Sequence, residues 1–339
     1  MGADSAIIVD CEFDACWPFA ADHFHELWRR EGPVQFVRLA PAQASNPLDL
    51  LHDPQNVRRI ALLTRRKIDW NRLGALEEVA IDAGQEDAGP ILHPRGVQVY
   101  WQLSEGFWGQ SVAEFGLALT LCALRRIPQT YREMITSHQP WDYSPPNNAG
   151  QPGQRGMQFG DDVRFTHGTL AGKRVRLVGM GNIGSRYASF ARTLGADVAA
   201  WDPLASEPSF HRSGARQLHR IEEVVRDAQV FAPMMPLVEK TRGLVTAELI
   251  RALPRGCLVV LVTRAGIVDM VEVRRRVLAD ELSLAADVFD IEPLPLDDPL
   301  LGRHNVVHTP HNAGRTRDAN YAWAEALAAR FKCRGEMRT

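Results

Sequence analysis

The sequence Gly179-Met180-Gly181-Asn182-Ile183-Gly184 stands between an apolar, β-branched run at 173–178 and a helical pattern at 183–194. The first glycine permits a tight strand-to-helix turn, the second lets the backbone approach a pyrophosphate, and the third packs the helix against the strand. The helix then offers unbonded N–H groups and the positive end of its dipole to an anion. This context predicts a dinucleotide-binding turn rather than a glycine turn that serves packing alone.

A carboxylate follows at the end of the next expected strand, 196–201. Asp202 lies close to the spacing, about 20 residues on, at which an acid accepts hydrogen bonds from the adenosine ribose hydroxyls. A negative charge at this position also repels a 2′-phosphate. The sequence therefore favours NAD over NADP as the cofactor.

Length and composition indicate a soluble protein of two domains. The chain has 339 residues, long for a single core, and a formal net charge of −2 with no basic block that would favour nucleic acid. It begins without a charged leader and apolar stretch, and no apolar run reaches about 18 residues, so we expect neither secretion nor a membrane span. Five scattered cysteines favour a reduced, cytoplasmic location and no metal site.

Strand-like and helix-like segments alternate on both sides of the glycine turn. We expect strands at 6–11, 34–39, 60–64, 78–81, 96–101, 229–235, 257–263, 283–289 and 305–309, and helices at 18–30, 247–252 and 271–279. This alternation predicts parallel sheets covered by helices. The expected fold is α/β, with two parallel-sheet domains.

Two stretches outside this alternation of strands and helices are informative. Ser111-Val112-Ala113-Glu114 has the spacing of a helix capping box, so we expect a helix to begin there and run to Arg126. It is apolar on nearly every side, which favours contact with another subunit as well as with the core. The Pro- and Gly-rich residues 143–168 are interpreted as an ordered arm or flap.

Three polar side chains follow strands that should end at the same edge of the second sheet: Arg264, Glu292 and His311. Taken singly they could be a surface charge, a loop acid and a turn residue. Together they suit reduction of a 2-keto acid, because a guanidinium can hold the carboxylate and polarise the carbonyl while a histidine supplies the proton. A neighbouring carboxylate favours the imidazolium form that reduction requires.

With these residues in place, the chain resembles the D-isomer-specific 2-hydroxyacid dehydrogenase family. The matching stretches are 111–114 with the helix that follows to 127, then 170–184, 236–244, 263–269, 286–289 with 292–293, and 309–314. Their order and spacing hold throughout, which makes the series far more specific than any single motif.

The resemblance implies a Rossmann-type dinucleotide-binding domain, 109–314, inserted into a smaller flavodoxin-like catalytic domain formed by 1–108 and 315–339. It implies that Arg264 binds substrate, that Glu292 and His311 form the acid/base pair, and that the helix from Ser111 lies at a homodimer interface. The implied cofactor contacts are Gly179, Gly181, Asn182, Ile183, Gly184, Asp202, Pro236, Thr241, Thr263, Asp287 (to the nicotinamide carboxamide) and Gly314. The implied substrate contacts are Ala83, Gly84, Arg264 and His311.

The chain departs from the family at several places, three of which lie at or near the expected substrate site. Ala265 stands where glycine is usual, which is tolerable if its φ is negative. Leu261 stands where an asparagine is common. The glycine-rich substrate loop is poorly matched: Ala83-Gly84 is the best placement, although from those residues alone a simple loop fits better. These departures affect substrate identity more than reaction type.

The sequence thus predicts an NAD-dependent oxidoreductase that transfers a hydride between NAD(H) and a small D-2-hydroxyacid or its 2-keto acid, similar to glyoxylate and hydroxypyruvate reductases. Two alternatives remain open. One is a phosphite or formate dehydrogenase, although formate enzymes similar to this family carry glutamine where Glu292 stands. The other is a non-enzymatic NAD(H)-sensing protein similar to the corepressors of this family. We expect a small-molecule substrate and no nucleic-acid or membrane partner.

Overall fold

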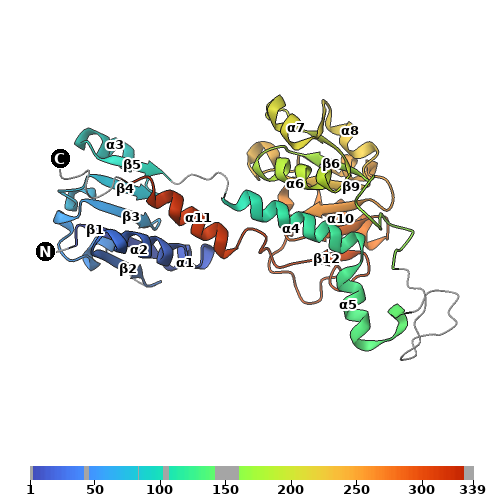
Figure 1. The fold of residues 1–339 in the computed structure, drawn as a ribbon, viewed down its shortest axis with the longest axis horizontal. Helices are drawn as coiled ribbons and strands as arrows, with labels where there is room; N and C mark the ends of the chain where they lie inside the picture. The colour runs from blue at the N-terminus through green and yellow to red at the C-terminus, as the bar shows by residue number, and fades with distance from the viewer. Residues whose placement is uncertain (1–2, 42–45, 83, 102–106, 142–159, 332–339) are drawn as a thin grey trace. The chain divides into compact units, whose positions relative to one another are not determined.

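The computed structural model describes residues 3–41, 46–82, 84–101, 107–141 and 160–331 (Figure 1). The chain forms two compact units: unit 1 is Met1–Phe107 with Arg315–Thr339, and unit 2 is Trp108–Gly314. Unit 2 therefore interrupts the sequence of unit 1. Ala83 and most of the stretch 143–168 lie outside the described residues, so the substrate contact and the arm expected there stay predictions.

Unit 1 is built on a five-stranded parallel sheet in the order β2-β1-β3-β4-β5. The strands are β1 (Ser5–Asp10), β2 (Val34–Leu39), β3 (Arg59–Leu63), β4 (Glu78–Ile81) and β5 (Gln98–Trp101). This is the strand order of the flavodoxin-like doubly wound sheet. The helices of the unit are α1 (Cys11–Cys16), α2 (Ala20–Glu31), α3 (Ala88–Leu92) and α11 (Arg317–Ala328). Because α11 packs along α2, the last described helix of the chain completes the unit formed by the first hundred residues.

Unit 2 is built on a seven-stranded parallel sheet in the order β12-β11-β10-β9-β6-β7-β8. The strands are β6 (Arg174–Val178), β7 (Asp197–Trp201), β8 (Arg216–Leu218), β9 (Val230–Pro233), β10 (Leu258–Leu261), β11 (Ser283–Ala286) and β12 (Val306–His308). Strand order reverses between β6 and β9, as in a Rossmann sheet, with β12 added at the edge. Both sheets confirm the expected α/β fold.

Helices cover both faces of the unit 2 sheet. Successive residues of a strand point to opposite faces, so Leu258 and Val260 of β10 join one core while Val259 and Leu261 join the other. The first core is closed by α4 (Phe107–Leu124), α6 (Asn182–Thr193) and α7 (Glu207–Ser213), and the second by α8 (Ile221–Arg226), α9 (Ala247–Ala252) and α10 (Met270–Leu278). The sheet is buried on both sides, which explains the apolar strands.

The capping box expected at Ser111 is wrong. The helix α4 begins at Phe107, so Ser111 lies inside it, and its hydroxyl donates to the carbonyl of Ala313 at 2.6 Å. An apolar, aromatic first turn has no sequence signal as clear as a capping serine. The serine instead joins α4 to the loop that follows β12.

The helix α4 bears on the expectation that the chain has no membrane span. Among the described residues it is long and apolar enough to do so by length and composition, with 44% of that window buried. These criteria are weak grounds for a span, because a core helix satisfies them too. Buried residues of α4, among them Ala113, Leu119 and Leu124, join the core of unit 2.

Candidate active site

The glycine turn joins β6 to α6 at the point where strand order reverses. Gly179 has a φ of 100°, which favours glycine. A Cβ at Gly184 would lie 2.1 Å from the carbonyl oxygen of Gly179, so helix and turn touch there. A Cβ at Gly181 would meet no described atom within 4 Å. This open side at the N-terminus of α6 fits a pyrophosphate. Gly179 makes the expected turn and Gly184 the expected helix packing, whereas the approach of Gly181 to a pyrophosphate stays a prediction.

The first residues of α6 are held from the side by α4. A Cβ on Gly109 of α4 would lie 2.7 Å from the side chain of Asn182, so a larger residue at 109 would force Asn182 to move. Ile183 packs against the core of unit 2. Sequence reasoning missed Gly109, because a glycine inside an apolar helix carries no motif of its own.

Asp202 lies directly beyond β7 and is tied to the glycine turn. Its Oδ2 accepts a hydrogen bond from the backbone N–H of Met180 at 2.7 Å, and its Oδ1 accepts from Leu204 and Ala205 at 2.9 and 3.1 Å. All three donors are backbone N–H groups, which fix the carboxylate beside the glycine turn. The negative charge expected beside the turn is therefore in place; its contact with a ribose stays a prediction.

Three further expected cofactor contacts lie in the loops after β9 and β10. The hydroxyl of Thr241 donates to the carbonyl of Pro236 at 2.6 Å and accepts from the N–H of Val238 at 2.9 Å, so it closes its own loop. The buried hydroxyl of Thr263 donates to the carbonyl of Pro233 at 3.2 Å and joins the ends of the two strands. These residues shape the carboxyl edge of the sheet next to the glycine turn.

The structure brings His311 and Glu292 together. Nδ1 of His311 lies 2.7 Å from Oε2 of Glu292, and Oε1 of Glu292 accepts from the N–H of Phe289 at 2.8 Å. An ionised carboxylate can only accept, so Nδ1 carries the proton and Nε2 of the neutral ring is free to take one. The side chains are 37% and 35% exposed, so solvent screens the pair. Its role is orientation of the ring rather than stability.

His311 has a φ of 56°, a strained conformation for a residue with a Cβ. Asp287, which is fully buried at the end of β11, fixes the surrounding loop. Its Oδ1 accepts from the hydroxyl of Thr309 at 2.6 Å and from the N–H of Asn312 at 3.1 Å, and its Oδ2 accepts from the N–H of Ala313 at 2.9 Å. Asp287 therefore positions the histidine. Sequence reasoning missed this role, although an acid that ends an apolar strand is a signal for it.

Arg264 follows β10, the strand beside β11, and is exposed. Its Nη1 donates to the carbonyl of Thr263 at 2.7 Å, and within the described residues no hydrogen bond or ion pair joins it to Glu292 or His311. Its remaining donors are available to an anion at the same edge. The substitution at Ala265 is tolerated as expected, because this residue is not among those with positive φ.

The last expected cofactor contact, Gly314, ends unit 2. A Cβ there would lie 3.5 Å from Val112 and 3.8 Å from Trp108, both in α4. These are ordinary contact distances, so the backbone at Gly314 packs closely on α4. The contact of Gly314 with the cofactor stays a prediction.

The carboxyl edge of the unit 1 sheet carries a different set of groups. Asp10, at the end of β1, accepts from Nε of Arg66 at 2.8 Å and from the hydroxyl of Thr64 at 3.2 Å. Burial raises the pKa of Asp10, but these bonds outweigh burial and lower the pKa overall. Gly84 has a φ of 79°, and the buried Gln85 donates to the carbonyl of Arg66 at 2.6 Å. Sequence reasoning missed the Asp10–Arg66 pair, whose members are far apart in the chain.

Within the described residues, no group of three or more His, Cys, Asp or Glu side chains is arranged to hold a metal ion. Two pairs of polar side chains lie at the sheet edges: Glu292 with His311 in unit 2, and Asp10 with Arg66 in unit 1.

Comparison with known proteins supports the geometry of unit 2. Residues 117–313 match the NAD binding domain of the D-isomer specific 2-hydroxyacid dehydrogenases. This match lies within unit 2 and covers more than half of the chain. Unit 2 therefore carries an NAD-binding domain, and NAD is its cofactor.

Two relatives and one solved structure extend the comparison. A D-3-phosphoglycerate dehydrogenase of Methanocaldococcus jannaschii is 29% identical over 67% of this chain, which spans only 40% of that relative's length. A glyoxylate reductase of Korarchaeum cryptofilum is 27% identical over 93% of this chain and 89% of its own length. A D-isomer specific 2-hydroxyacid dehydrogenase of Lactobacillus delbrueckii ssp. bulgaricus, in its NAD complexed form, has a TM-score of 0.68 at 16% identity and 96% coverage of both chains, which shows the shared fold.

Proposed function

This chain belongs to the D-isomer specific 2-hydroxyacid dehydrogenase family, and from that premise we propose that it transfers a hydride between NAD(H) and a small D-2-hydroxyacid or its 2-keto acid. The observation that carries the proposal is the 2.7 Å contact between His311 and Glu292 at the carboxyl edge of the NAD-binding sheet. An acid/base pair at that edge is the group that interconversion of a carbonyl and an alcohol requires.

The side chains of unit 2 divide the work of the reaction. When bound, NADH supplies the hydride to the carbonyl carbon. Arg264 pairs with the substrate carboxylate through its unused guanidinium donors and polarises the carbonyl. His311, protonated on both nitrogens, gives the Nε2 proton to the carbonyl oxygen as negative charge develops there, while Glu292 holds Nδ1. In the oxidative direction the neutral ring accepts the hydroxyl proton at Nε2.

We propose that Asp202 is the residue that favours NAD over NADP. Its carboxylate is fixed by Met180, Leu204 and Ala205 at the end of β7. Oδ2, which accepts only the bond from Met180, keeps acceptor capacity for a ribose hydroxyl. A 2′-phosphate at the same place would meet a fixed negative charge.

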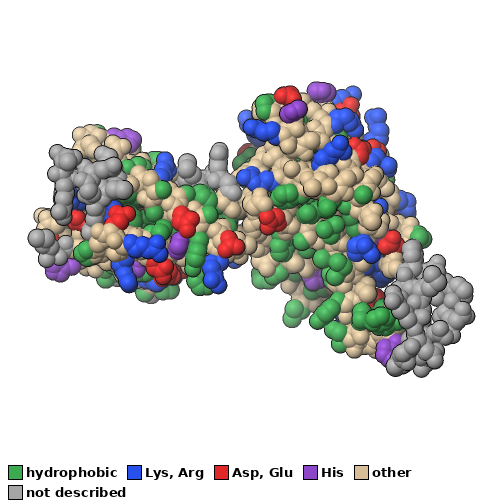
Figure 2. Space-filling model, viewed as in Figure 1, with side chains coloured by type: hydrophobic (Ala, Val, Ile, Leu, Met, Phe, Trp, Pro, Cys, Tyr) green, Lys and Arg blue, Asp and Glu red, His purple; other side chains and the backbone are tan. Residues whose placement is uncertain are grey.

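We also propose a homodimer, on the basis of the apolar surface of α4 and α5 (Ile127–Thr136). No described residue of α5 is buried, and it exposes Ile127, Tyr131, Met134 and Ile135. Figure 2 shows hydrophobic side chains gathered over the part of unit 2 where α4 lies. An apolar surface of this kind is typical of an interface between subunits. Sedimentation of the full chain would give its mass.

The test of the proposed function is NADH oxidation, followed by absorbance, with glyoxylate, hydroxypyruvate, pyruvate, phenylpyruvate and 2-ketoisocaproate. NADPH serves as the control cofactor. Turnover of any keto acid with NADH supports the proposal, and the ranking of the acids measures the size of the substrate site. Binding of NADH without turnover of the panel contradicts it and favours phosphite oxidation or a sensing role.

A further inference from the structure

The loop between β11 and β12 carries Glu292 but has little apolar anchoring. Val288 before it and Leu300 after it are fully buried, yet no apolar side chain from 289 to 299 is buried in this fully described stretch. Leu296 is 97% exposed. Because the 2.7 Å contact of Glu292 with His311 needs a fixed loop, polar contacts must hold it.

One side chain supplies those contacts at both ends of the loop. Arg274, in the middle of α10, donates from Nε and Nη2 to Asp290, with a shortest distance of 2.8 Å. Its Nη1 donates to both oxygens of Asp298 at 2.9 and 3.1 Å. Asp290 precedes Glu292 by two residues and Asp298 follows it by six, so the guanidinium bridges the loop on either side of Glu292.

The bridge lies where charges interact strongly. The side chain of Arg274 is 17% exposed and that of Asp298 is 7% exposed, so solvent screens this pair less than a surface pair. Asp298 also accepts from the N–H of Leu300 at 2.9 Å, which fixes the carboxylate itself. The planar guanidinium can serve two carboxylates at once, whereas an ammonium cannot do so with the same geometry.

We propose that Arg274 is a positioning residue: by joining Asp290 to Asp298 it holds Glu292 against Nδ1 of His311. This inference rests on the proposed function for its kinetic consequence. Its structural consequence, the tautomer of His311, does not depend on any substrate. When Glu292 is held, Nδ1 carries the proton; when the loop is released, that preference is lost.

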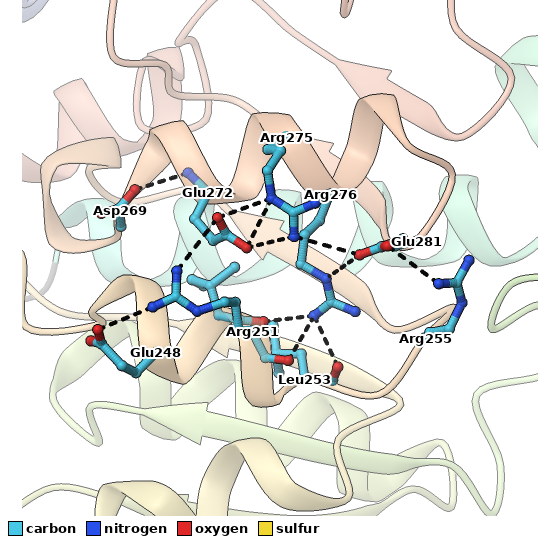
Figure 3. A network of polar contacts seen from close by, with 10 residues as sticks. Glu248, Arg251, Leu253, Arg255, Asp269, Glu272, Arg275, Arg276 and Glu281 are labelled. Atoms are coloured by element: carbon cyan, nitrogen blue, oxygen red, sulfur yellow. Dashed lines mark hydrogen bonds and ion pairs between the residues drawn. The ribbon is translucent and has the colours of Figure 1, made fainter.

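The neighbouring arginine provides a matched control. Figure 3 shows Arg275 and Arg276 turned toward Glu272 and Glu281, and Arg274 is not part of that network. Arg275 is the next residue of α10 after Arg274 and donates to Glu272 at 2.7 Å. Among its contacts in the described chain, neither Asp290 nor Asp298 appears. Replacing Arg275 therefore removes an arginine and an ion pair from α10 while leaving the loop joined.

The experiment measures the side-chain ¹⁵N resonances of His311 in the full chain without substrate, identified by their absence in His311→Gln. His308 also interacts with Asp298; burial lowers the pKa of His308 more than the nearby carboxylate raises it, so a measurement at pH 8 keeps this imidazole neutral. We expect the wild type and Arg275→Gln to show a protonated Nδ1. We expect Arg274→Gln to show a mixture in which Nε2–H is the larger share.

Kinetics give the second readout. With the keto acid that the wild type reduces best, we expect kcat of Arg274→Gln to fall about 10-fold, because the histidine is still present but less well oriented, with Kd for NADH unchanged. Arg274→Lys should lie between Arg274→Gln and the wild type. If Arg274→Gln does not fold, Asp290→Asn removes one half of the bridge and should show the same tautomer shift to a smaller extent.

Two results would overturn the proposal. One is a wild-type tautomer in both Arg274→Gln and Asp290→Asn. The other is an equal shift in Arg275→Gln, which would assign the effect to the helix rather than to the bridge. A wild type that reduces no keto acid would contradict the proposed function alone, since the tautomer still reports on Arg274.

Discussion

The carboxyl edges of the two sheets are built in different ways. In unit 2 the polar residues beyond the strands bond to one another within a short span: Asp287 secures the loop of His311, and Glu292 holds its ring. In unit 1 the edge is assembled from separate loops, with Arg66 bonded to Asp10 and Gln85 bonded to the carbonyl of Arg66. The edge of unit 2 is therefore built from short sequence motifs, whereas the edge of unit 1 is built from pairs of residues that are far apart in the sequence.

This difference separates the residues that serve the reaction shared by the family from those that recognise one substrate. The family match covers unit 2 and stops at residue 313, at the end of the His311 loop. Hydride and proton transfer need the same groups whatever the substrate, so the edge of unit 2 can be encoded in short, repeatable stretches. Recognition of one particular acid has no such common solution. We infer that reaction type is set in unit 2 and substrate preference in unit 1.

The largest effect is expected from replacing the histidine at the carboxyl edge of the unit 2 sheet. His311→Gln should lower kcat for keto-acid reduction by about 10³-fold, because a general acid is lost from the transition state. The Kd for NADH, measured by fluorescence titration, should stay unchanged, since the substitution leaves the proposed cofactor site at the glycine turn intact.

The control for that variant is His304→Gln. His304 precedes β12 at the opposite edge of the same sheet and lies 3.3 Å from Asp280. Its replacement should leave kcat unchanged. A parallel collapse of NADH affinity in His311→Gln would show that this histidine is structural and would contradict the assignment.

A smaller effect is expected at the cofactor end of the same edge. Asp202→Ala removes the carboxylate fixed beside the glycine turn and should reduce the preference for NADH over NADPH by about 10-fold to 100-fold, because a like charge opposing the 2′-phosphate is gone. The ratio of kcat/KM for the two cofactors measures it. An unchanged ratio would place selectivity in other residues.

Sequence reasoning recovered the parts of the fold that repeat a local pattern. Alternating apolar strands and helices gave both parallel sheets, and β4 and α9 lie at the expected residues, 78–81 and 247–252. It gave no element between 203 and 226, where the structure has α7, β8 and α8, because their runs are short and polar. It misplaced the start of α4, because a serine within the helix imitated a cap.

The candidate site divides in the same way. Glu292 and His311 were expected to pair, because each follows a strand that ends at the same edge of the sheet. In the structure, Oε2 of Glu292 lies 2.7 Å from Nδ1 of His311. The groups that hold them were missed: Asp287 acts through backbone N–H groups, and Arg274 reaches Asp290 and Asp298 from a different helix. Such contacts depend on packing between elements, which the spacing of residues along one strand does not encode.

The smallest expected kinetic effect tests the edge of unit 1. Gly84 and Gly96 have nearly the same φ, 79° and 77°, but Gly84 lies beyond β4 at the carboxyl edge while Gly96 precedes β5 at the other. Alanine at either position should lower the free energy of unfolding by about 1–2 kcal/mol, because the backbone of both glycines is in the left-handed region. A Cβ at Gly84 would also lie 3.0 Å from Arg65, whereas one at Gly96 meets no described atom within 4 Å.

If unit 1 selects the substrate, Gly84→Ala should raise KM for the keto acid about 10-fold by displacing the loop, with kcat and the Kd for NADH nearly unchanged. Gly96→Ala should lose stability in urea through its positive φ alone and keep the wild-type KM. Equal KM values in the two variants would mean that the loss comes from strain alone, and would remove substrate selection from this edge. A fall in kcat with Gly84→Ala would instead mean that unit 1 takes part in the chemistry. That result would contradict the inference that unit 1 sets only substrate preference.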